Sequence, residues 1–165
     1  MQKAILSGGV ASIVVAAGDG TVSYGGARIE SVAPGLFTAD TSGSGVAAAL
    51  ARVLHADGTV TTALTFACRQ AGDCIATPIP LGGAGDVAAV ELYGTGIRGR
   101  SSLDNVACTI GAIAAQVLYA GPQGQRPGND QVNILLPHAL AGAGLVRIEL
   151  SADGHPANTV TILIQ

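Results

Sequence analysis

The residues most suggestive of chemistry are Gly94, Gly96 and Gly99, which form a GxGxxG motif directly after the apolar run 87–93. In dinucleotide-binding folds such glycines let a pyrophosphate approach the backbone at a helix N-terminus, and an acidic residue about twenty positions later binds the ribose. Here the segment that follows, 100–105, is polar and turn-like, and the position of the acid falls within the Ala-Gln-Val of 115–117. We therefore interpret the motif as a loop between strands and expect no cofactor, with a dinucleotide-dependent enzyme as a remote alternative.

Side chains suited to nucleophilic catalysis or metal binding are scattered along the chain. No GxSxG motif occurs, and His55, His138 and His155 each lie beside a turn or a proline. The proximity of His55 to Asp57 is explained better by the end of a surface hairpin than by a catalytic dyad. Residues 40–45 resemble the start of a calcium loop, but they carry one carboxylate where calcium needs several. We expect no enzyme activity, no catalytic residue and no metal site.

Three cysteines bear on the compartment. Cys68 and Cys74 are six residues apart, a spacing that allows the two strand ends of a hairpin to be joined, so we predict a disulfide, with two free thiols as the alternative. A disulfide indicates an oxidising compartment. Cys108 lies in the alternating apolar stretch 106–110, where a buried free thiol is expected.

Charge and composition exclude several classes of partner. Eight Lys and Arg against eleven Asp and Glu give a net charge of −3 without a basic block, so a nucleic-acid partner is not expected. No uninterrupted apolar run approaches the roughly 20 residues that span a bilayer, so we expect no membrane span. Aromatic residues make up only 3% of the chain, which weakens a carbohydrate-binding platform, and the five rings fall mostly in segments that we assign to the core: Tyr24, Phe37, Phe66, Tyr93 and Tyr119.

The elements that must position these residues are short strands. Segments rich in β-branched residues recur every ten to fifteen positions, separated by Asp-Gly and Gly-Gly turns and by prolines. This pattern predicts an all-β sandwich or barrel of about 8–10 short strands. Residues 47–55 have helical propensity but lead into an Asp-Gly turn, so we predict a strand there, and we predict one helical turn at 137–141. Residues 1–17 fit either a signal peptide or a strand, and the strand fits better.

The predicted core consists of apolar residues that alternate along these strands: Val14, Ile29, Leu36, Leu50, Leu64, Val90, Leu92, Ile110, Leu118, Val132, Ile134, Ile148, Val160 and Ile162. The longest polar loop, rich in Gly and Pro, is 120–130, and it is therefore the best candidate for a functional surface loop.

Five segments carry a resemblance to a known family: 31–39 (SVAPGLFTA), 92–101 (LYGTGIRGRS), 117–124 (VLYAGPQG), 130–133 (DQVN) and 158–160 (NTV). Together they resemble the C-terminal domain family of secreted acidobacterial (Solibacter-type) proteins, over roughly residues 12–165. The resemblance implies that 1–165 is a single immunoglobulin-like β-sandwich, forming the C-terminal part of a longer exported bacterial chain, secreted or at the cell surface. It supplies no catalytic residues.

We therefore expect a non-catalytic structural or recognition module of the adhesion type. Its expected partners are other domains of the same parent chain and a cell-envelope or extracellular polymer. The alternative is a small-ligand or glycan-binding domain that uses loops 94–101 and 120–130, where arginines can meet an anionic group. The candidate contact residues in these two loops are Arg98, Arg100, Gln123, Arg126 and Asp130.

Overall fold

The structure, a computed structural model, describes residues 9–165. The chain divides into two compact units, Met1–Ser31 and Val32–Gln165. The predicted sandwich occupies the second unit. The signal-peptide interpretation of 1–17 falls partly on residues 1–8, which lie outside the described residues.

The first unit is a hairpin of β1 (Gly9–Ala16) and β2 (Val22–Ile29), paired antiparallel. Its turn forms as the Asp-Gly signal predicts, because Asp19 accepts hydrogen bonds from the amide and hydroxyl of Thr21. The core assignment of Val14 and Ile29 is wrong: their side chains are 58% and 36% exposed. Within the described residues of this unit, 9–31, the two strands form a single layer, and no second layer covers these side chains.

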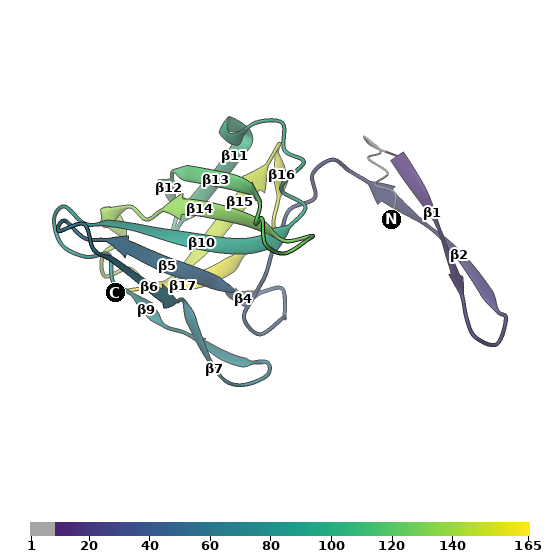
Figure 1. Ribbon diagram of the computed structural model, residues 1–165, viewed down its shortest axis with the longest axis horizontal. Coiled ribbons are helices and arrows are strands. Elements are labelled where there is room, and N and C mark those ends of the chain that lie inside the picture. The colour runs from purple at the N-terminus through teal and green to yellow at the C-terminus, as the bar shows by residue number, and fades with distance from the viewer. Residues whose placement is uncertain (1–8) are drawn as a thin grey trace. The chain divides into compact units, whose positions relative to one another are not determined.

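The second unit is a β-sandwich of two main sheets, which face each other in Figure 1. The six-stranded sheet has the order β13-β14-β10-β5-β6, with β3 also paired to β10. Its strands are β3 (Gly35–Leu36), β5 (Ala49–Leu54), β6 (Val60–Leu64), β10 (Val87–Thr95), β13 (Val117–Pro122) and β14 (Asp130–Leu135).

The seven-stranded sheet has the order β12-β11-β15-β17-β4, with β16 on β15 and β9 on β17. Its strands are β4 (Gly45–Val46), β9 (Pro78–Ile79), β11 (Val106–Ile110), β12 (Ile113–Ala115), β15 (Gly144–Ala152), β16 (His155–Pro156) and β17 (Val160–Ile164). A further hairpin of β7 (Phe66–Gln70) and β8 (Asp73–Ala76) forms a separate two-stranded sheet. Two short 3₁₀ turns, η1 (Leu103–Asn105) and η2 (His138–Leu140), complete the fold, and the second is the predicted helical turn.

The core lies between the two main sheets and follows the period-2 alternation of the strands. Nine of the predicted core residues are buried: Leu36, Val90, Leu92, Ile110, Val132, Ile134, Ile148, Val160 and Ile162. Leu50 is only partly buried, on the face of β5 opposite to the buried Ala49 and Ala51. Leu64 and Leu118 are about half exposed, at 53% and 48%. Leu64 lies on the edge strand β6, and Leu118 lies on β13 where the register shifts between Val117 and Tyr119. A register shift changes which side chains face the core.

Among residues 9–165, no helix is long and apolar enough to cross a membrane.

Candidate functional site

The glycine motif lies at the end of β10 and makes room for neighbouring backbone. A Cβ at Gly94 would lie 2.2 Å from the carbonyl oxygen of Gly35, and one at Gly96 would lie 1.9 Å from that of Ala33. Gly96 also has φ of +72°, and its carbonyl accepts a hydrogen bond of 3.0 Å from the Ala33 amide. The space that a pyrophosphate occupies in a dinucleotide fold is here filled by residues 33–36, so the glycines serve close backbone packing.

Two of the predicted contact residues, Arg98 and Asp130, bind each other. Asp130 is fully buried and accepts hydrogen bonds from the amides of Ile97 (2.7 Å) and Arg98 (3.1 Å) and from the Arg98 Nε (2.6 Å). Arg98 also donates through Nη2 to the carbonyl of Asn129. The pair therefore fastens the loop after β10 to the start of β14, and its charges are used within the protein.

Arg100 lies in a different environment. Its amide donates to the Ile97 carbonyl, and its Nε is buried without a hydrogen-bond partner in the described part of the chain. The pKa of Asp153 is lowered by hydrogen bonds from the Ser101 hydroxyl and amide, followed by the charges of His155 and Arg100. Arg100 is not among the residues that line the pocket described next.

The other predicted loop residues, Gln123 and Arg126, line a pocket of about 340 Å³ at one end of the six-stranded sheet. Its apolar wall is formed by residues from three segments, and its polar rim by the loop between β13 and β14. The lining residues are Phe37, Ala48, Tyr93, Gln123, Gln125, Arg126 and Asn129. A pocket of this size, with apolar walls and a few polar groups, is typical of a site for a small ligand or one unit of a polymer.

Backbone hydrogen bonds hold the apolar wall in place. The Phe37 amide donates to the Tyr93 carbonyl (2.8 Å), and the Ala48 amide donates to the Phe37 carbonyl (2.9 Å). The preceding residue, Leu36, is clamped by the Asn158 side chain, which accepts from its amide at 2.7 Å and donates to its carbonyl at 2.9 Å. Asn158 belongs to the 158–160 segment of the resemblance, and it acts here as a structural tie.

The rim loop is also organised before any ligand arrives. The side-chain oxygen of Gln123 accepts from the amides of Gln125 (3.1 Å) and Arg126 (3.0 Å). The Gln123 amide donates to the Asn129 carbonyl, and the Asn129 amide donates to the Arg126 carbonyl. A loop ordered in this way loses little conformational freedom when it binds a ligand.

Charge at the pocket is unbalanced toward positive. Arg126 makes no side-chain hydrogen bond or ion pair within residues 9–165. Glu91, which accepts a hydrogen bond from the Tyr93 hydroxyl at 3.3 Å, is paired with Arg52 at 2.6 Å. Burial, followed by Glu91, raises the pKa of Tyr93, so its hydroxyl is protonated at neutral pH. The pocket thus offers one uncompensated guanidinium beside two aromatic rings.

Sequence reasoning assigned most rings to the core, and this was wrong for three of them. Tyr24 is 81% exposed, Phe37 38% and Tyr119 37%, while Tyr93 is partly exposed at the pocket. One signal was available: on β10 the buried residues alternate, so Tyr93 shares the opposite face with the charged Glu91. The position of Phe37 had no such signal, because it depends on a pairing with β10 across the fold.

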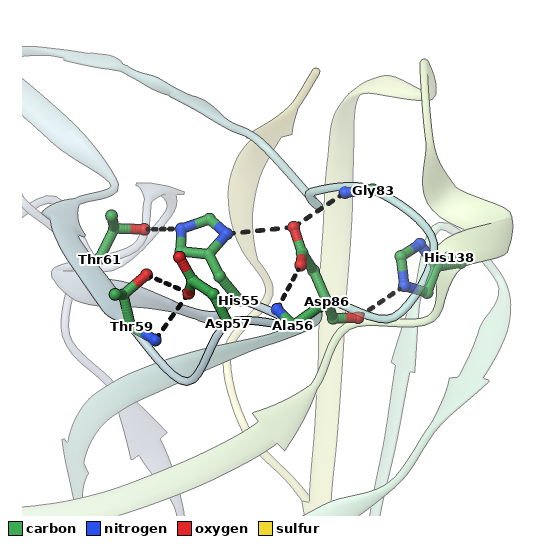
Figure 2. Close-up of polar contacts among 8 residues, drawn as sticks. All are labelled: His55, Ala56, Asp57, Thr59, Thr61, Gly83, Asp86 and His138. Atoms are coloured by element: carbon green, nitrogen blue, oxygen red, sulfur yellow. Dashed lines mark hydrogen bonds and ion pairs between the residues drawn. The ribbon is translucent and has the colours of Figure 1, made fainter.

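A second polar cluster joins two loops at the opposite end of β5 and β10 (Figure 2). His55 pairs with Asp86, at 3.1 Å from Nδ1, and its Nε2 lies 3.1 Å from the Thr61 hydroxyl. Asp57 caps its own turn through the Thr59 amide and hydroxyl, as expected for the end of a hairpin. The carboxylate that contacts the His55 ring is Asp86, which the loop before β10 brings to the histidine.

Thr61, His55 and Asp86 stand in the order of a nucleophile, a base and an orienting acid. The amides of Ala56 and Gly83 both donate to the Asp86 carboxylate at 2.9 Å, so this acid is held by two loops as well as by the histidine. Hydrogen bonds from Gly83, the His55 ring and Ala56 lower the pKa of Asp86 to about 2. The cluster joins the loop after β5 to the loop before β10 through the contacts of Asp86 that Figure 2 shows.

The predicted disulfide between Cys68 and Cys74 is present and joins β7 to β8. Cys108 is a buried free thiol, as expected, and burial raises its pKa to about 12.

Comparison of the chain with protein-family models, with curated proteins and with solved structures found no match. The fold and site define an all-β, disulfide-bonded sandwich with a preformed surface pocket. The acidobacterial family and the immunoglobulin-like topology stay predictions.

Proposed function

We propose that the chain is an adhesion-type recognition module of an exported bacterial protein, immunoglobulin-like in topology, which binds an extracellular polymer through the pocket of Phe37, Tyr93 and Arg126. The observation that carries the proposal is the pocket itself: two rings and an unpaired cation held on a loop that its own hydrogen bonds have already ordered.

The cysteines support export. The Cys68–Cys74 bond closes a short exposed hairpin, and such disulfides persist in oxidising compartments outside the cytosol. The cell envelope and extracellular matrix are therefore where the binding partner is sought.

The test is a pull-down of the purified chain with insoluble polysaccharides and bacterial cell-envelope fractions. Phe37→Ala removes a ring from the pocket, and Arg126→Gln removes the charge. Arg69→Gln is the matched control, because Arg69 is an exposed arginine on the disulfide hairpin and is not among the residues that line the pocket. We expect saturable binding that both pocket variants weaken and the control retains.

Absence of binding to every fraction, or binding that the pocket variants leave unchanged, would contradict the proposal. The chain would then be better explained as a structural spacer or cap for the other domains of its parent protein.

A further inference from the structure

The ligand class of the pocket follows from its charge and its apolar wall. We infer that the pocket binds a saccharide unit that carries a carboxylate, such as a uronic-acid residue of an acidic polysaccharide. This inference rests on the proposed function and specifies its ligand.

The charge of the pocket favours an acidic ligand. No Asp or Glu is among the described residues that line the pocket. Two carboxylates on the neighbouring strands β10 and β14 are already paired, Glu91 with Arg52 and Asp130 with Arg98, each at 2.6 Å. Arg126 is therefore left to pair with a group from outside, and a guanidinium forms its strongest contacts with planar carboxylates, which it binds through two parallel hydrogen bonds.

The apolar wall of the pocket favours a ligand with an apolar face. Phe37 and Tyr93 present ring surface, and Ala48 adds a methyl group between segments that the backbone holds together. A simple inorganic anion gains nothing from these surfaces. A sugar ring has an apolar C–H face that packs on them, as well as hydroxyl groups at its rim.

Two side-chain amides on the rim of the pocket favour a ligand with hydroxyl groups. Gln125 and Asn129 lie on the rim with side chains that carry both donors and an acceptor, and neither side chain is engaged in a hydrogen bond within residues 9–165. Amides of this kind match hydroxyl groups, which also donate and accept. At about 340 Å³ the pocket is at the small end of the range for ligand sites, so it holds one or two sugar units.

The test is isothermal titration of the full 165-residue chain with trigalacturonate and with trimannuronate, compared with the methyl ester of the first and with neutral cellotriose. We expect at least one acidic trimer to bind about tenfold or more tightly than the ester and cellotriose, because one charge-assisted contact is lost in both. Arg126→Gln is expected to remove this preference, while Arg69→Gln keeps it. The melting temperature of Arg126→Gln should equal that of the wild type, because the Arg126 side chain makes no described bond.

Several outcomes would overturn the inference. These are an affinity for the ester equal to that of the tighter-binding acidic trimer, an acid preference that survives Arg126→Gln, absence of binding to both acidic trimers, and binding of inorganic phosphate or benzoate as tightly as the trimers. The pocket could instead bind neutral cellotriose, with binding abolished by Phe37→Ala and unaffected by Arg126→Gln. This result would overturn the inference that the ligand carries a carboxylate, while leaving the recognition function intact. The envelope pull-down decides the recognition function separately.

Discussion

Asp130→Ala is expected to destabilise the sandwich strongly, because the carboxylate is fully buried and holds three donors. Its removal leaves the buried Ile97 amide and the partly buried Arg98 amide without partners. Each buried donor left unpaired costs about 1–3 kcal/mol. Two amides lose their acceptor, while the half-exposed Arg98 guanidinium can turn to solvent, so we expect a loss of roughly 2–5 kcal/mol in the free energy of unfolding.

Arg98→Ala should cost less than Asp130→Ala. The guanidinium is 42% exposed, and the carboxylate keeps both backbone amides after the change. Asp104→Ala is the matched control, because Asp104 is an exposed acid and substitutions at such sites usually change stability by less than about 0.5 kcal/mol. The expected order of destabilisation is Asp130→Ala, then Arg98→Ala, then Asp104→Ala.

The assay is urea unfolding followed by far-UV circular dichroism, since the chain has no tryptophan to report by fluorescence. The midpoint and slope give the free energy of unfolding for each variant. If Asp130→Ala were as stable as Asp104→Ala, the conclusion that this carboxylate holds the loop after β10 to the start of β14 would be refuted.

Three further predictions concern backbone, pH and thiol chemistry. Gly96→Ala should lower the melting temperature much more than Gly124→Ala. Both glycines have positive φ, but a Cβ at Gly96 would clash with the Ala33 carbonyl, while a Cβ at Gly124 would meet nothing within 4 Å. Thermal melting of the two variants tests this difference. The pKa of Asp86 is lowered to about 2 in the folded state, so its contribution to stability is present above about pH 5 and is lost as the pH falls toward 2. The urea midpoint of Asp86→Asn should therefore fall less than that of the wild type across this pH range. Cys108 should react with iodoacetamide only after unfolding, since its thiol is buried and its pKa is about 12, and rapid labelling of the native protein would contradict this.

Local features of the structure could be predicted from the sequence. The strands 49–54, 87–95, 106–110 and 160–164 follow from period-2 alternation bounded by turn residues, because alternation depends only on the pleat of the strand. The Cys68–Cys74 bond followed from a spacing of six residues across a tight turn. Two of the five predicted contact residues, Gln123 and Arg126, line the pocket.

Pairings between distant residues could not be predicted in this way. Asp130 lies 32 positions from Arg98, and Asp86 lies 31 positions from His55. Composition and spacing show that these groups exist, but only the pairing of β10 with β14 and with β5 brings each to its partner. Arg98 and Asp130, which the sequence indicated as ligand contacts, therefore form an ion pair with each other.

Burial at the margins of the fold also depended on the tertiary structure. The sequence by itself determined which side chains share a face of each strand, because successive residues point to opposite sides. It did not determine whether a second layer covers that face: Leu64 is on an edge strand, Leu118 follows a register shift, and Val14 is in a hairpin of its own unit. Whether a face becomes core, surface or pocket is decided by the neighbours that the fold places over it, and these come from elsewhere in the chain.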